Sequence, residues 1–270
     1  AGLGATTENV FGTCSPKDFE TMMQLTYLTF TAPRKDMEAF ESYKSRTKAQ
    51  LESAQANPLS SISDTLQRAM YGNHPRVVLL KPEMVDHRIL EMYNDRFKDA
   101  SDFTFYFVGN IDLETAKPLI AEYLGALPVI NRKETFKDTK MDIRKGVYKN
   151  EYAKEQQTPT ATIVFLYSGK APYTLKNNIL LSCMTQVLDM VYTEEVREKE
   201  GGTYGVNCIG NLQKYPKEQL LMQIVFQTDP EKKDKLAGIV VDELKKLAAE
   251  GPSDVHLQKV KEYMLKMHTG

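Results

Sequence analysis

The pattern of apolar and polar positions in the first half of the chain predicts mostly helices, with strands at two places. Residues 102–110 alternate between apolar and polar side chains as a strand does, and residues 8–13 also resemble a short strand. A helix is expected to begin at Ser15, a good N-cap followed by Pro16, and to end at Pro33. Helical spacing recurs in four further segments: residues 35–55, 58–71, 82–98 and 111–128.

The second half predicts more strands and longer helices. Residues 175–199 are expected to form one helix whose middle is apolar nearly all round, which is typical of a helix packed under a sheet. Residues 203–211 and 219–227 are predicted to be strands joined by a hairpin-like turn. The remaining elements predicted here are strands at 145–153 and 160–168, and helices beginning near Asp229 and Ser253.

A polar, charged stretch after residue 128 marks the predicted domain boundary. We expect a first domain at residues 1–130, a linker at 131–144 and a second domain at 145–270. Residues 14–51 and 228–267 share one order of cap, proline, apolar helix, second proline and polar helix, which indicates two related domains, although any two strand–helix–helix runs resemble each other. If they are equivalent, the chain enters the first domain partway and leaves the second early, so both domains are expected to be truncated.

The charges nearly balance in this chain of 270 residues, with 35 Lys and Arg against 36 Asp and Glu. We therefore expect neither nucleic acid nor an anionic membrane as a partner. The apolar stretches fall short of the roughly 20 residues that span a bilayer, and the first ten residues do not form a signal peptide. The three cysteines have no CxxC spacing, and we interpret Cys14, Cys183 and Cys208 as small buried hydrophobes.

No pattern in the chain predicts a metal site, an activated nucleophile or a cofactor loop. None of the four histidines lies in an HxxEH or HxxxH spacing, which would place two imidazoles on one helix face. We expect solvated or capping roles for all four: His74, His87, His256 and His268. Sequences typical of a nucleophile elbow, a phosphate loop or a dinucleotide loop are also absent.

One short stretch combines a cation, a phenol and two glycines: residues 197–206, REKEGGTYGV. Its simplest interpretation is a helix stop, in which Gly201 or Gly202 takes the left-handed conformation and Arg197 favours the negative end of the helix dipole. A functional interpretation places Arg197 and Tyr204 on one side of a cleft. Guanidinium and phenol groups bind a peptide carbonyl or the oxyanion formed when water attacks it, but they do not activate water.

The stretch VREKEGGTYGV resembles the Arg and Tyr motif in the C-terminal half of insulinase-like (pitrilysin-type) zinc metallopeptidases. SPKDFETMMQLTYLTFTAPRKDMEAF is similar to the third domain of the long bacterial members, and VGNIDLETAKPLIAEYLGALP is similar to the end of that domain. The resemblance covers most of residues 8–265 and preserves the order of elements.

The resemblance implies an α+β fold of the LuxS/mitochondrial-processing-peptidase-like metallohydrolase type, with mostly antiparallel sheets and helices packed on one face. It implies residues 1–130 as the later part of the third domain and 145–270 as the early part of the fourth. Arg197 and Tyr204 would be catalytic contacts to the substrate carbonyl and the tetrahedral intermediate, with Gly201 and Gly202 in the substrate-binding turn. Zinc and a Glu general base would belong to the N-terminal half, and no metal ligand or cofactor is expected here.

We therefore expect a C-terminal-half fragment of a zinc endopeptidase, inactive alone, whose partners are the zinc-bearing N-terminal half and unfolded peptides. The alternative is a non-catalytic peptide-binding or scaffold subunit of the same fold. Long bacterial relatives are commonly periplasmic, and the resemblance implies that compartment. Substrate preference and oligomeric state are not encoded in any pattern of this stretch.

Overall fold

The computed structural model describes residues 1–56, 58–78, 80–155 and 158–269, and the chain divides into two compact units. Unit 1 is Ala1–Tyr148 and unit 2 is Lys149–Gly270. The division therefore falls just beyond the predicted linker. That the two units are consecutive homologous domains of a longer protein stays a prediction.

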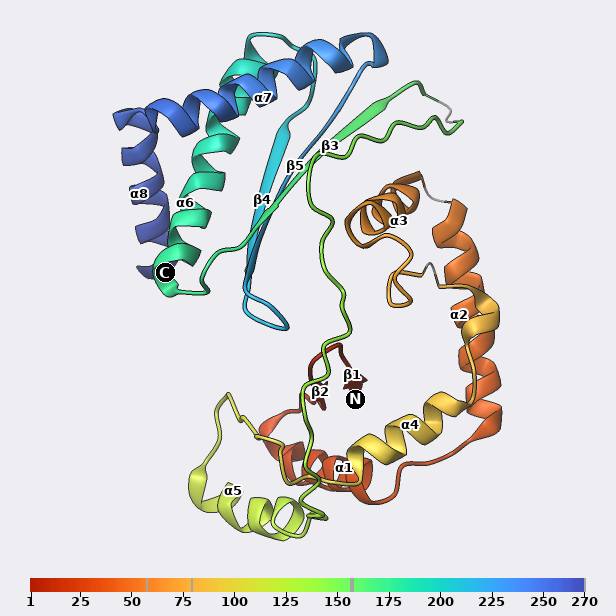
Figure 1. Ribbon diagram of the computed structural model, residues 1–270. Helices are drawn as coiled ribbons and strands as arrows, with labels where there is room; N and C mark the ends of the chain where they lie inside the picture. The colour runs from red at the N-terminus through yellow and green to blue at the C-terminus, as the bar shows by residue number, and fades with distance from the viewer. Residues whose placement is uncertain (57, 79, 156–157, 270) are drawn as a thin grey trace. The chain divides into compact units, whose positions relative to one another are not determined.

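Unit 1 is mainly helical (Figure 1). Its α-helices are α1 Phe19–Thr31, α2 Met37–Ala56, α3 Pro58–Tyr71, α4 Arg88–Phe97 and α5 Leu113–Leu119. Short 3₁₀ turns precede α1 and α4, at η1 Pro16–Asp18 and η2 Pro82–Met84, and a π-helical turn, η3 Ile120–Leu124, continues α5. Two-residue strands β1 Gly2–Leu3 and β2 Glu8–Asn9 form a small antiparallel pair.

The core of unit 1 is aromatic. Phe30 of α1 and Phe97 of α4 are buried and meet edge to face, with 5.7 Å between ring centroids, and Phe103 lies 4.9 Å from Phe30. Edge-to-face pairs of this kind add about 0.5–1.5 kcal/mol to the burial of the rings. These contacts explain why α1, α4 and the segment after α4 come together.

Two predicted strands are absent from the described residues. Residues 103–108, within the predicted strand 102–110, alternate between half-buried and exposed side chains but form no strand ladder, and the predicted strand at 145–153 is likewise irregular. Both strand predictions were therefore wrong: a strand needs a neighbour to pair with, and no described segment pairs with either. The predicted strand at 8–13 is confirmed only at Glu8–Asn9.

Unit 2 contains a three-stranded antiparallel sheet in the order β3–β5–β4. The strands are β3 Ala161–Gly169, β4 Val206–Gln213 and β5 Gln219–Thr228. The helices are α6 Leu175–Tyr192, α7 Lys233–Glu250 and α8 Asp254–Thr269, with a π-helical turn η4 Thr193–Glu198 after α6 and a 3₁₀ turn η5 Pro230–Lys232 before α7. The hairpin between β4 and β5 confirms the sequence prediction.

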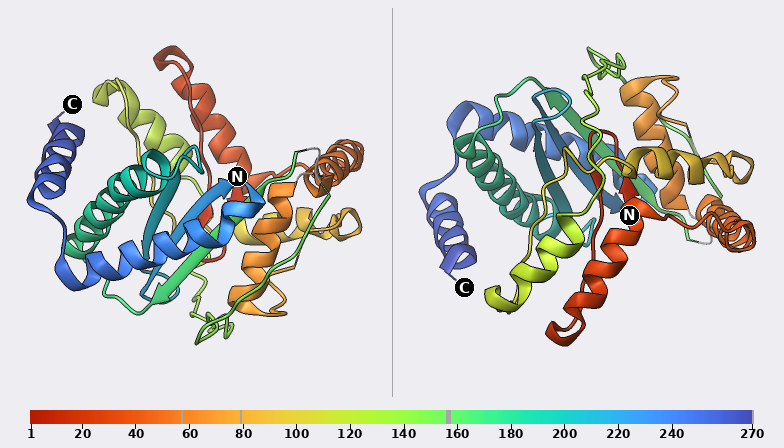
Figure 2. Two further views of the ribbon diagram at one scale, coloured as in Figure 1. Left: turned by 90° about the horizontal axis from the view of Figure 1, so that it is seen from above. Right: turned by 90° about the horizontal axis from the view of Figure 1, so that it is seen from below.

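Helices α6 and α7 cover one face of this sheet (Figure 1 and Figure 2). Alternate residues of the strands point toward them, as the pleat requires, and Ile224 and Phe226 of β5 are almost fully buried. Leu188 of α6 and Leu236 of α7 fill the same core. The fold is therefore a mixture of helices and antiparallel sheet with the helices on one face, as predicted.

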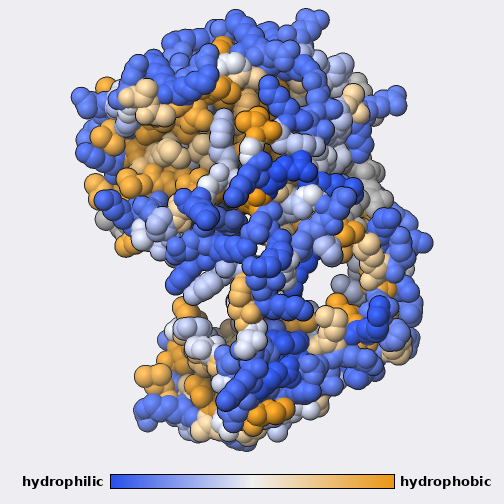
Figure 3. Space-filling model, in the orientation of Figure 1, coloured by the Kyte–Doolittle hydropathy of each residue, from blue (hydrophilic) through white to orange (hydrophobic). Residues whose placement is uncertain are grey.

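Apolar side chains also gather on the surface of unit 2 over α6 and α8 (Figure 3). Exposed members include Leu175 and Leu180 of α6 and Tyr263 of α8. The cysteines do not share one environment: Cys208 is buried as predicted, Cys183 is only half-buried, and Cys14, just before η1, is exposed, so the prediction was wrong for Cys14.

Candidate functional site at the end of α6

Helix α6 ends in a π-helical turn that carries Arg197. Within η4, the backbone N–H of Lys199 donates to the carbonyl of Glu194 at 3.2 Å, the five-residue spacing of a π-helix. Val196 is fully buried and anchors this turn to the core, while Arg197 next to it is exposed. Single π turns inside or after α-helices are frequent at functional sites, because they redirect one side chain without ending the helix.

The two glycines have different physical roles. Gly201 has φ +57°, the left-handed region, and its N–H donates to the carbonyl of Arg197 at 3.0 Å. Gly202 is required by space: a Cβ there would lie 2.7 Å from Cδ1 of the buried Leu236. The predicted glycine stop is therefore confirmed at Gly201, and Gly202 allows α7 to approach the turn.

Strand β5 also holds this turn. The hydroxyl of Thr228, its last residue, donates a 2.5 Å hydrogen bond to the carbonyl of Gly202. The Thr203 hydroxyl lies 3.1 Å from the carbonyl of Gly205 and accepts from its N–H at 3.3 Å. The backbone between Arg197 and β4 is thus fixed at several points.

Arg197 and Tyr204 stand at the two ends of this fixed turn. Tyr204 is 100% exposed and Arg197 is exposed. Within the described residues, neither the guanidinium nor the phenol forms a hydrogen bond or an ion pair. Both groups are accessible to a ligand, and the predicted shared cleft stays a prediction.

A contact from α8 supports η4. Nε2 of His256 lies 3.1 Å from Oε1 of Glu194, the second residue of the π turn, and the His256 side chain is only 14% exposed. The N–H of His256 donates to Oγ of Ser253, which caps α8. His256 was predicted to be solvated or capping, because its partner lies 62 positions away in the sequence. Its actual place is against the turn that bears Arg197.

A carboxylate from α6 positions the start of β4. Oδ1 of Asp189 accepts a 2.8 Å hydrogen bond from the backbone N–H of Cys208. Burial raises the pKa of Asp189, and the Cys208 N–H partly offsets that effect. Burial also raises the pKa of the Cys208 thiol well above its ordinary range, so this thiol is inert toward nucleophilic chemistry.

The described residues do not fit a zinc ion. They contain no group of three or more His, Cys, Asp or Glu side chains placed to hold a metal. The ring of His74 lies 2.9 Å from the carbonyl of Thr139 through Nε2 and accepts from the N–H of Arg76 through Nδ1, so neither nitrogen is free to bind metal. The side chain of His268 lies outside the described residues.

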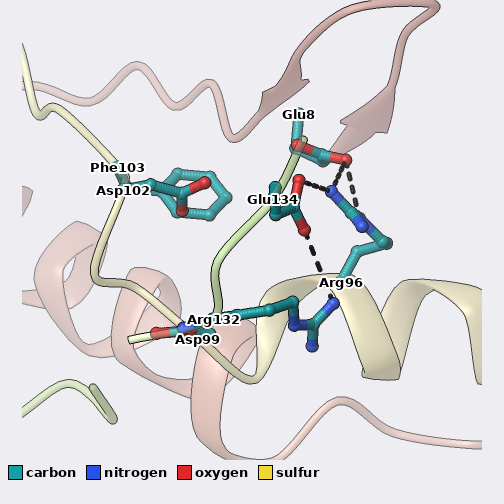
Figure 4. A pocket seen from close by; sticks show the side chains of 7 residues that line it. All are labelled: Glu8, Arg96, Asp99, Asp102, Phe103, Arg132 and Glu134. Carbon is teal, nitrogen blue, oxygen red and sulfur yellow. Dashed lines mark hydrogen bonds and ion pairs between the residues drawn. The ribbon is translucent and has the colours of Figure 1, made fainter. Parts of the chain in front are cut away.

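A second polar cluster lies in unit 1 around a cavity of about 10 Å³, roughly the space of one water molecule (Figure 4). Arg96 of α4 pairs with Glu8 and Glu134, each at 2.7 Å, and Arg132 donates to the backbone carbonyl of Asp95 at 2.6 Å. These contacts join β2, α4 and the segment after residue 128.

The carboxylate of Asp99 is the centre of the same cluster. It is buried and accepts from three backbone N–H groups: Arg132 at 2.8 Å, Ile130 at 3.0 Å and Ser101 at 3.1 Å. These donors, Arg132 foremost, hold the pKa of Asp99 well below its usual range. Because Glu8, Arg96, Arg132, Glu134 and Asp99 are paired with one another or with backbone groups within unit 1, we interpret the cluster as structural.

A match to the family described as the peptidase M16 inactive domain covers residues 87–264, and the chain belongs to this family. Two curated relatives are zinc proteases by name. A zinc protease PQQL-like protein of Arabidopsis thaliana is 24% identical over 281 residues, which cover 93% of this chain and 28% of the relative. A probable zinc protease PqqL of Haemophilus influenzae is 21% identical and covers 92% of this chain and 27% of the relative. The chain thus spans little more than a quarter of each.

Solved structures show the same fold. The periplasmic protease PqqL from Escherichia coli matches with a TM-score of 0.74 at 18% identity, over 93% of this chain and 28% of that one. The first half of the same protease, solved separately, matches with a TM-score of 0.64 at 14% identity, over 94% of this chain and 56% of that one. Among the described residues, no helix is long and apolar enough to cross a membrane.

Proposed function

We propose that this chain is the non-zinc C-terminal half of a zinc metalloendopeptidase. It binds peptide substrate and stabilises the tetrahedral intermediate for a zinc site in the N-terminal half. The observation that carries the proposal is the turn after α6, where an exposed guanidinium and an exposed phenol, without partners among the described residues, flank a backbone fixed by α7, α8 and β5.

The two side chains have complementary chemical abilities. The guanidinium of Arg197 offers several N–H donors in a planar fork. Tyr204 offers one O–H donor. Both groups donate to a carbonyl oxygen, and both donate more strongly once that oxygen becomes an oxyanion. Neither is a base, so the activation of water belongs to another part of the protein.

Two comparisons support a longer parent protein. The chain covers little more than a quarter of relatives that are named as zinc proteases, and it also matches the separately solved first half of PqqL. Similarity to both the whole protease and its first half fits a protein built from repeated domains. We infer that residues 1–130 are the later part of a third domain and residues 145–270 the early part of a fourth. The neighbour's periplasmic location suggests the same compartment here.

The test is reconstitution. The purified chain is expected to bind no stoichiometric zinc and to cleave no peptide, whereas mixing it with the zinc-bearing half restores hydrolysis. One tight zinc per chain, or hydrolysis by the chain alone, would contradict the proposal. Peptide binding without restored hydrolysis would support the alternative, a non-catalytic peptide-binding or scaffold subunit. The coding sequence upstream of Ala1 also separates the peptidase from the non-catalytic subunit. An HxxEH motif about two domains before Ala1 would support the peptidase.

A further inference from the structure

Three lysines stand at the start of α7, where the helix dipole disfavours positive charge. Two of them have carboxylate partners: Lys233 pairs with Glu151, and Lys235 pairs with Glu200. The ammonium group of Lys232 forms no hydrogen bond or ion pair with any described residue, and only its backbone N–H is bonded, to the carbonyl of Asp229. A cation at an unfavourable position, without the partner that its neighbours have, is a candidate for a functional role.

Lys232 lies against the same turn as Arg197 and Tyr204. A Cβ at Gly202 would lie 3.3 Å from Cδ of Lys232, so the aliphatic part of the lysine covers this glycine. The ammonium group is only one carbon further along the side chain. Gly202 lies between Arg197 and Tyr204 in the sequence, so the lysine stem packs on the turn that carries the two proposed contacts.

We propose that Lys232 is a third substrate contact and that it selects peptides carrying a carboxylate near the bound segment. This inference rests on the proposed function, because it requires that a peptide binds at this turn. Lys232 would attract a carboxylate only in its own vicinity. Glu231 and Asp234 also lie at the start of α7, so the surface there is not uniformly positive. The carboxylate can come from an Asp or Glu side chain or from the C-terminus of the peptide, and the same ammonium would bind either.

The test compares four labelled peptides on the 270-residue chain by fluorescence anisotropy. One pair differs only by an internal Glu or Gln, and the other only by a C-terminal acid or amide. We expect the acidic member of at least one pair to bind about two- to fivefold more tightly at low salt, the range of an exposed ion pair, and the preference to decrease as salt is added. The pair that shows the preference identifies the source of the carboxylate.

The variant Lys232→Met keeps the apolar stem over Gly202 and removes the charge. It is expected to bring the acid-to-neutral ratio close to one, and Lys232→Glu is expected to reverse it. Lys235→Met is the matched control: its ammonium already pairs with Glu200, so this variant should retain the preference.

Three results would overturn the inference: no acid preference in the unchanged chain, an equal loss of preference in Lys235→Met, or no peptide binding at all. A separate measurement, the turnover of Tyr204→Phe, tests the proposed catalytic role. If Lys232→Met removes the preference while Tyr204→Phe leaves turnover unchanged in the longer protein, the turn binds acidic peptides without contacting the reacting carbonyl. If Tyr204→Phe slows turnover and no acid preference exists, only the lysine assignment is wrong.

Discussion

A Cβ at Gly202 would lie 2.7 Å from Cδ1 of Leu236, a residue with 0% exposure. Gly202→Ala must therefore displace a packed core leucine, and overpacking of this kind typically costs about 1–3 kcal/mol. We expect a lower thermal midpoint together with altered peptide binding, because the same shift moves Lys232. Calorimetry checks the first effect.

Gly205 provides the control for this substitution. A Cβ at Gly205 would meet nothing within 4 Å, and its backbone is outside the left-handed region. Gly205→Ala should leave the midpoint almost unchanged. An equal effect at both glycines would show that the contact with Leu236 does not explain the requirement at Gly202.

The second prediction concerns the left-handed backbone of Gly201, at φ +57°. Gly201→Ala is expected to destabilise the folded chain by about 1–2 kcal/mol, because a Cβ is unfavourable in this conformation although nothing else lies nearby. Gly201→Asn should cost less, since Asn tolerates the left-handed region better. Denaturant titrations of both variants measure the difference, and a greater loss with Asn would contradict the assigned conformation.

The third prediction concerns the pair between His256 and Glu194. His256→Ala removes the contact from α8 to η4, so the π turn should open more often. Amide hydrogen exchange at Lys199 and Gly201, whose N–H groups bond to carbonyls inside this turn, is expected to become faster. His256→Gln retains a donor for Glu194 and should exchange at an intermediate rate. Unchanged exchange in His256→Ala would mean that the turn is held without the contact from α8.

The fourth prediction follows from the lowered pKa of Asp99. Because this carboxyl binds its proton less readily in the folded chain than in the unfolded chain, its stabilising effect is complete above the ordinary carboxyl pKa. That effect is lost as the pH falls through this value toward the lower folded pKa. Unit 1 should therefore melt at lower temperature as the pH decreases below about 4, near the ordinary value of 3.8.

Asp99→Asn is the matched variant for this pH effect. Asn cannot ionise, so its variant should melt at lower temperature near neutral pH and should lose less stability on acidification. If the melting temperatures of the two proteins fall by the same amount between pH 6 and pH 3, the role assigned to the three backbone donors is contradicted.

Local signals in the sequence predicted most of the helices well. Pro16 and Pro33 bracket the first helical region, which the structure places from Pro16 to Thr31, but the Ser15 side chain does not cap it, because its hydroxyl donates to the Asp18 carboxylate instead. The helix expected near Asp229 begins there, and the Asp229 carboxylate accepts from the N–H of Glu231. These signals work because caps and prolines act within a few residues of themselves. The fold class followed from the same order of elements.

Contacts between distant segments were not visible in the sequence. Residues 103–108 alternate as a strand does, but pairing depends on a neighbour that alternation does not identify. His256 and Glu194 are 62 positions apart, and Lys232 meets the glycine turn only because α7 packs there. The sequence therefore indicated the turn with Arg197 and Tyr204, but not the three elements that hold it.

The most direct test of the catalytic claim is the turnover of Tyr204→Phe in the longer protein, measured with a single peptide at saturating concentration. Loss of one donor to an oxyanion typically lowers the rate about 10²–10³-fold, and Tyr204→Phe should do so with little change in peptide affinity. Phe preserves the ring, and the exposed position of Tyr204 makes a folding defect an inadequate explanation. Turnover equal to that of the unchanged protein would contradict the account.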